Sequence, residues 1–168
     1  MRLLWISAAF AFGIDQLSKY LIINILGLSQ FRPIDVLPPI LNFRYGENRG
    51  INFGLLGDGT SVWVLVGIAV AICAGVLWWM TKHPQQPLAR VFAGLLIGGA
   101  LANVLDRLLY GFVLDVLNSS CCGINNPFVF NVADIFIFAG AIGLVFFGDE
   151  GGSDKTAKPK KRPVQKDG

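Results

Sequence analysis

The sequence predicts an all-α polytopic membrane protein with four transmembrane helices and a small extracytoplasmic β-hairpin element. Two observations predict this class. Of the 168 residues, 54% are hydrophobic and only 15% are charged, whereas soluble domains carry about 25% charged residues. The apolar residues also form long runs with the length that a helix needs to cross a bilayer. A soluble fold of this composition would expose large apolar patches.

Four segments are expected to cross the membrane. The first follows Arg2 and contains Ala9-Phe10-Ala11, which resembles the cleavage region of a signal peptide. Its apolar pattern continues past these residues, so we expect an uncleaved helix. The second is an uninterrupted apolar run of twenty residues. The four expected spans are about 3–27, 61–80, 88–109 and 128–147.

The third and fourth spans carry further signals. Gly94, Gly98 and Ala102 recur every four residues, as in membrane helices that pack closely, so we interpret them as packing residues. Pro127 precedes the fourth span and is well placed to start its first turn. Asp134 would then lie about two turns, or roughly 10 Å, into that helix.

The segment between the first two spans, about 29–60, predicts the β element. Residues 41–45 alternate between apolar and polar side chains, as a half-buried strand does. Residues 46–50 supply turn chemistry, and the alternation resumes at 51–53. We expect a small hairpin on the membrane surface, too small to be an independent domain.

The distribution of basic residues predicts the topology. Four spans place both termini on one side, where Arg2, Lys82, Arg90 and six basic tail residues make nine. The positive-inside rule puts both termini in the cytoplasm, so the β element faces outward. We expect one membrane-embedded domain over residues 1–148. Residues 149–168 are expected to form a disordered basic cytoplasmic tail beside the anionic leaflet, not a nucleic-acid site.

The cysteines and the single histidine indicate neither a metal site nor a cofactor. Cys73 lies within an apolar run and is interpreted as a packing residue. Cys121 and Cys122 are adjacent, and either free thiols or a vicinal disulfide fits them. No metal-ligand spacing includes His83, so no metal is expected.

Charged residues within the expected spans need an explanation, because burying a charge is costly. Asp15 and Lys19 are four residues apart and can form an ion pair on one helix face. A structural pair that offsets its own burial is favoured over a catalytic role. Asn103, Asp106 and Arg107 are also neighbours on a helix surface. They fit a polar cluster that locks two helices as well as part of a site.

Asp115 and Asp134 are harder to explain as structural residues. Asp115 follows Gly111, which is expected to end a helix, and is flanked by apolar side chains. Asp134 lies within the fourth span, with Asn131 three residues before it. The third and fourth spans are antiparallel neighbours joined by a short loop, so the two carboxylates can meet at the outer leaflet.

Two carboxylates at hydrogen-bonding distance tend to share one proton. Such a pair suits peptide hydrolysis, since one carboxylate activates a water while the other, protonated, polarises the scissile carbonyl. No serine–histidine, HExxH or reactive cysteine motif competes for this role. The sequence therefore predicts a catalytic aspartate pair.

At these residues the chain resembles the lipoprotein signal peptidases, also called signal peptidase II. The resemblance covers residues 10–140. It depends on five motifs in order: Asp15-Gln-Leu-Ser-Lys19, Asn48-Arg-Gly50, Gly98-Gly-Ala-Leu-Ala-Asn103-Val-Leu-Asp106-Arg107, Val113-Leu-Asp115 and Phe130-Asn131-Val-Ala133-Asp134.

The resemblance implies an aspartic endopeptidase of the bacterial inner membrane. Such enzymes remove the signal peptide from diacylglyceryl-modified prolipoproteins, cutting just before the lipid-bearing cysteine. The expected partners are these precursors and membrane lipids, and the expected state is a monomer. Asp115 and Asp134 match the catalytic dyad. The residues that match supporting positions are Asp15, Asn48, Gly50, Asn103, Asp106, Arg107, Asn131 and Ala133.

Two other classes remain as alternatives. A small proton-coupled transporter would also use intramembrane carboxylates, but the chain lacks evident internal repeats and its polar residues gather at one leaflet. A purely structural or assembly-factor membrane protein would explain the small-residue stripe and the tail. It leaves Asp115 and Asp134 unexplained.

Overall fold

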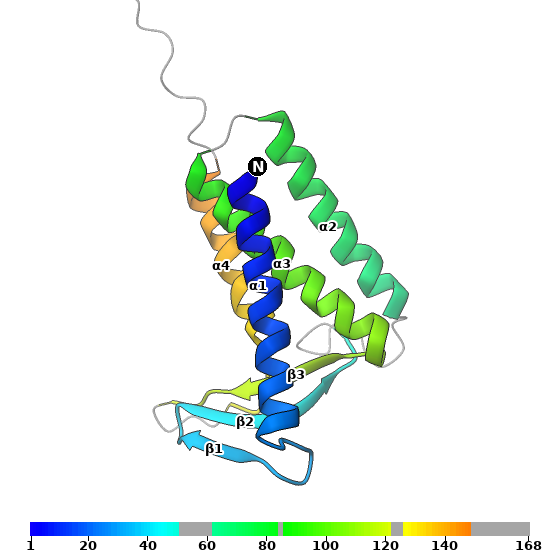
Figure 1. Ribbon diagram of the computed structural model, residues 1–168, viewed down its shortest axis with the longest axis vertical. Helices are drawn as coiled ribbons and strands as arrows, with labels where there is room; N and C mark the ends of the chain where they lie inside the picture. Colours follow the sequence, from blue (N-terminus) through cyan, green and yellow to red (C-terminus); the bar gives the residue numbers. More distant parts are fainter. Residues whose placement is uncertain (51–61, 84–85, 122–125, 149–168) are drawn as a thin grey trace, which may run out of the picture.

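The computed structural model describes residues 1–50, 62–83, 86–121 and 126–148. Four α-helices and a three-stranded sheet make up this part of the chain (Figure 1). A π-helical turn, η1, continues the first helix. The elements in chain order are α1 (Arg2–Tyr20), η1 (Leu21–Ile25), β1 (Ile34–Leu37), β2 (Leu41–Asn48), α2 (Val62–Lys82), α3 (Pro87–Tyr110), β3 (Val113–Asn118) and α4 (Val132–Phe147).

The helix α3 lies at the centre of the bundle and contacts α1, α2 and α4 (Figure 1). Within the described residues, three helical segments are long and apolar enough to cross a membrane: α1 with η1, α2 and α3. The expected fourth span is an apolar helix of 16 residues. α1 begins and α4 ends at the same end of the bundle, and the sheet lies at the other end (Figure 1).

Small residues let the helices approach closely around α3. A Cβ added to Gly94 would meet the Ser7 side chain, and one added to Gly98 would meet the carbonyl of Ala8. Ala102 is fully buried. The packing interpretation of this stripe is therefore confirmed.

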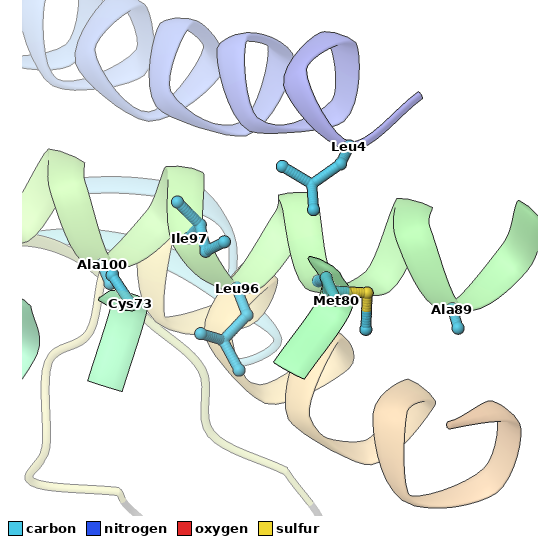
Figure 2. Close-up of a cluster of buried hydrophobic side chains, with 8 residues drawn as sticks. Leu4, Cys73, Met80, Ala89, Leu96, Ile97 and Ala100 are labelled. Atoms are coloured by element: carbon cyan, nitrogen blue, oxygen red, sulfur yellow. The ribbon is translucent and has the colours of Figure 1, made fainter. Parts of the chain in front are cut away.

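A cluster of buried apolar side chains fills the space between α1, α2 and α3 (Figure 2). Cys73 is a free, buried thiol in this cluster, as expected of a packing residue. Cys121 lies outside the cluster and is disulfide-bonded, so the free-thiol alternative is wrong for this residue.

The β element differs from the expected hairpin. The sheet is antiparallel with the order β1-β2-β3, and its third strand comes from the predicted connection between the third and fourth spans. Gly46 and Asn48 were expected in a turn, but they lie in β2 and pair with Asp115 and Val113 of β3. β3 is buried on both faces, so its sequence lacks the alternation by which a half-buried strand is found. Residues 51–53 lie outside the described residues.

The start of α4 also differs from the expectation. Asn131 is the N-cap, and Pro127 lies outside the helix. Phe130 instead pairs with Leu117 of β3 through backbone hydrogen bonds, which keeps this segment extended. Asp134 therefore lies in the first turn of α4, not two turns into it.

Candidate active site

Three local structures bring Asp115 and Asp134 to the sheet end of the bundle. α3 ends at Gly111, whose φ of 81° is the left-handed conformation that favours glycine, and the chain then enters β3. Asp115 pairs across the sheet with Gly46. A Cβ on Gly46 would make an ordinary contact of 3.6 Å with the Cβ of Asp115 and a tighter one of 3.3 Å with the Cβ of Val129. Asp134 is placed by the first turn of α4.

Asn131 connects the two carboxylates. Its side-chain Nδ2 donates to Asp115 Oδ1 at 2.6 Å, and its backbone N donates to Asp134 Oδ2 at 3.2 Å. Its Oδ1 accepts from the backbone N of Asp134 at 2.9 Å, which completes a capping box. One fully buried asparagine therefore caps α4 and orients both aspartates.

Two further amides hold the remaining carboxylate oxygens. Asn48 Nδ2 donates to Asp115 Oδ2 at 3.1 Å, and Asn103 Nδ2 donates to Asp134 Oδ1 at 3.0 Å. Asn103 also accepts from Asn131 at 3.2 Å through its Oδ1. The three asparagines of the predicted site thus form one network with the two aspartates.

The environment of Asp115 favours its protonated form. Burial, and next the charge of Asp134, raise the pKa of Asp115 to about 7. Hydrogen bonds from Asn131 and Asn48 and the positive charge of Lys19 oppose this rise. Asp115 is only 3% exposed, so the aspartate pair retains a proton close to neutral pH.

A cavity of about 550 Å³ opens beside Asp134 between α2, α3 and α4. Five of its lining residues are among those predicted for the site: Asn48, Gly50, Asn103, Arg107 and Asp134. The rest is apolar, with Leu65, Ile68, Ala69 and Ile72 of α2 facing residues of α3 and α4. This groove can hold an apolar chain with one polar end at Asp134.

Arg107 borders the groove on α3. Its guanidinium interacts electrostatically with Asp134 and Asp115 and lies 3.5 Å from the carbonyl oxygens of Asn103 and Gly50. The backbone N of Gly50 donates to Asn48 Oδ1 at 3.3 Å. Gly50 and Asn48 are therefore held next to the positive charge of Arg107.

The remaining predicted site residues are Asp15, Ala133 and Asp106, which are connected to one another through Lys19 and the backbone of Ala133. Asp15 Oδ1 accepts from the backbone N of Ala133 at 2.8 Å, and Lys19 Nζ lies 2.7 Å from Asp15, as the expected ion pair requires. Lys19 Nζ also lies 2.7 Å from Asp106 Oδ2. Asp106 thus links α3 to α1 and Asn103 links α3 to α4, while Arg107 contacts the carbonyl oxygen of Asn103.

The spacing of Asp15 and Lys19 predicts only a pair within one helix, so it does not reveal the link between Lys19 and Asp106 of α3. Gln16 was missed too, although its Nε2 donates to Asp106 Oδ1 at 2.9 Å. A signal was available: Lys19 and Asp106 are opposite charges near the same end of their predicted spans. Within the described residues, no group of three or more His, Cys, Asp or Glu could hold a metal ion.

Comparison with known proteins identifies the family. The sequence model of the family described as signal peptidase (SPase) II matches residues 7–148. The chain belongs to the signal peptidase II family. It is therefore a protease of a bacterial membrane, and the resemblance predicted from its motifs is confirmed.

Individual members of the signal peptidase II family agree over most of the chain. A lipoprotein signal peptidase of Alteromonas mediterranea is 39% identical over 159 residues, which are 93% of this chain and 85% of the relative. One of Pseudoalteromonas atlantica is 40% identical over 148 residues, covering 86% of this chain and 87% of the relative. A solved bacterial membrane enzyme, determined in meso at 2.3 Å resolution, has a TM-score of 0.75 at 28% identity and covers 93% of both chains.

Proposed function

We propose that this signal peptidase II is an aspartic endopeptidase that removes the signal peptide from diacylglyceryl-modified prolipoproteins, cutting before the lipidated cysteine. The main support is the bonding of both Asp115 and Asp134 to Asn131, together with the position of Asp134 in the lining of a largely apolar groove. The similarity to lipoprotein signal peptidases supports the substrate class. Family membership favours this function over a proton-coupled transporter.

In the proposed reaction, the aspartate pair acts with one shared proton. The ionised carboxylate takes a proton from a water, whose oxygen attacks the scissile carbonyl, while the protonated carboxylate donates to the carbonyl oxygen. Collapse of the tetrahedral intermediate breaks the C–N bond and passes a proton to the leaving amine. The amides of Asn48, Asn103 and Asn131 keep the two carboxylates oriented throughout.

We propose that the groove binds the signal peptide of the substrate. The apolar part of a signal peptide would lie along the α2 wall, next to Leu65, Ile68 and Ile72, with its cleavage site at Asp134. The guanidinium of Arg107 would donate hydrogen bonds to carbonyl oxygens of the substrate backbone near Asp134.

The proposal includes an orientation in the bacterial inner membrane. All four helices, α4 included, would span it, with both termini in the cytoplasm and the dyad at the periplasmic face. The positive-inside count and the common end of α1 and α4 support this topology. The exposed apolar side chains of Phe31, Val36 and Leu37 beside or in β1 would contact membrane lipids. We propose that the protein acts as a monomer with residues 149–168 as a cytoplasmic tail.

Cleavage of matched precursors tests the function. The purified protein in lipid vesicles should cleave a diacylglyceryl-modified precursor and leave the same unmodified precursor intact. Mass spectrometry should show a product whose first residue is the lipidated cysteine. Equal cleavage of the unmodified precursor, or a product that begins elsewhere, would overturn the proposal.

The raised pKa of Asp115 predicts a pH dependence. As pH rises through about 7, Asp115 loses its proton and the pair becomes doubly ionised, so the acid needed for the reaction disappears. The cleavage rate should therefore fall on the alkaline side of about 7. The groups that face Asp115 are Asp134 of α4, Lys19 of α1, Arg107 of α3, Asn48 of β2 and Asn131.

Single-turnover rates check this dependence. They are measured at several pH values in vesicles, with the protein in excess over the lipidated precursor. The unfolding temperature measured over the same range is the control, because it separates titration of the dyad from loss of the fold. A rate that keeps rising with pH well above 7 would contradict the assignment of the shared proton.

A further inference from the structure

Lys19 lies between two buried carboxylates from different helices. Its Nζ is 2.7 Å from Asp15 Oδ2 on α1 and 2.7 Å from Asp106 Oδ2 on α3. Lys19 is 3% exposed, and both aspartates are fully buried. One ammonium group therefore fixes the distance between α1 and α3 at the level of the site.

Each of these carboxylates also holds the backbone next to a dyad residue. Asp15 Oδ1 accepts from the backbone N of Ala133 at 2.8 Å, directly before Asp134. Asp106 Oδ2 accepts from the backbone N of Leu114 at 3.1 Å, directly before Asp115. The two bonds are equivalent in sequence, one residue ahead of each catalytic aspartate, although they come from different helices.

We propose that Lys19 is a positioning residue: by binding Asp15 and Asp106 together, it sets the spacing of the two backbone segments that carry Asp134 and Asp115. This inference rests on the proposed function. A contribution to stability alone is a weaker explanation, because buried ion pairs are often no more stabilising than apolar residues of similar size. Misplacement of reacting groups by about 1 Å can cost about 100-fold in rate.

The charge of Lys19 has a second, separable effect. It lowers the pKa of Asp115, against burial and the charge of Asp134, which raise it. Arg107 of α3 acts on the same pair, while Asn48 and Asn131 contribute hydrogen bonds. Loss of the ammonium should therefore move the alkaline limb of the rate profile to higher pH, which loss of an uncharged packing residue would not do.

A second cavity gives access to Lys19 from outside the groove. It has a volume of about 360 Å³ and is lined by Lys19 and Asp106 together with Gln16, Asn24 and tyrosine side chains. None of its lining residues lines the groove at Asp134. A small amine can thus reach Asp106 without competing with the substrate.

The test compares Lys19→Met with the unchanged protein in vesicles, using the lipidated precursor. We expect kcat to fall about 100-fold while KM stays within about twofold of that of the unchanged protein. The alkaline limb of the rate profile should move to higher pH. In Lys19→Ala, propylammonium should restore part of kcat, whereas tetramethylammonium, a cation without N–H donors, should not. Asn24→Ala, which changes the same cavity without touching the ion pairs, is the matched control and should retain the original kcat.

A folded Lys19→Met variant with unchanged kcat and pH profile would overturn the inference. If that variant does not fold, Asp106→Asn decides, since its amide oxygen can still accept from Leu114 while its bond to Lys19 weakens. We expect kcat to fall about tenfold at constant KM, with the alkaline limb moving to lower pH. A folded Asp106→Asn variant that keeps both the original kcat and the original position of the alkaline limb would overturn the inference. Failure of the unchanged protein to cleave would instead reject the proposed function.

Discussion

Replacing Asp115 or Asp134 by asparagine should lower the rate of precursor cleavage by about 1,000-fold, within the range that general acid–base catalysis contributes. Asparagine has nearly the same size and accepts hydrogen bonds, but it can neither take a proton from water nor return one. Both variants should therefore keep the fold and lose the reaction. Single-turnover cleavage of the lipidated precursor measures the effect, and accumulation of each variant in the membrane checks its folding.

Asp35→Asn is the matched control for this pair. Asp35 lies on β1 and forms an exposed ion pair with Arg44, well away from the dyad in the sheet order. Exposed ion pairs contribute little to stability, so this variant should cleave at the original rate. A folded Asp115→Asn or Asp134→Asn variant that cleaves within about tenfold of the unchanged protein would show that the dyad is not catalytic.

Replacing Asn131 by alanine should harm both stability and catalysis. The variant loses the N-cap of α4, which costs about 1 kcal/mol, and the bond that orients Asp115. With Asp115 held by the Asn48 amide but no longer by Asn131, we expect the rate to fall about 100-fold. Thermal unfolding measures the first effect, and kcat at constant KM measures the second.

Asn131→Ser separates the two effects. A serine hydroxyl can cap the helix by accepting from the backbone N of Asp134, but it is too short to donate to Asp115 as the asparagine amide does. Stability should therefore recover while the rate stays low. If the rate recovered together with stability, orientation of Asp115 by Asn131 would not limit the reaction.

The geometry around Asp134 was partly open to prediction from the sequence. The sequence predicts Asn131 and Asp134 as site residues, and their spacing is that of a capping box. Because the apolar run begins at Phe128, the helix was expected to begin there too. Pairing of Phe130 with Leu117 of β3 prevents this, and such a long-range contact leaves no local signal.

The position of Asp115 was harder to predict. Asn48 and Asp115 are 67 residues apart, and they meet only because β2 and β3 pair. The apolar neighbours of Asp115 marked it as unusual, but continuous burial of β3 removed the period-two pattern that would have revealed a strand. The residues that meet around Asp115 were thus easier to predict than the strand that carries it.

One side of the groove is formed by α2, and this affects how a substrate can enter. Only Leu65, Cys73 and Met80 of α2 are buried, so this helix is attached to the bundle more loosely than α3. In the proposed function, a lipid-modified precursor would diffuse sideways within the bilayer and enter next to α2, its acyl chains still among other lipids. Extracting those chains into water would cost about 0.8 kcal/mol for each methylene group, and lateral entry avoids this cost.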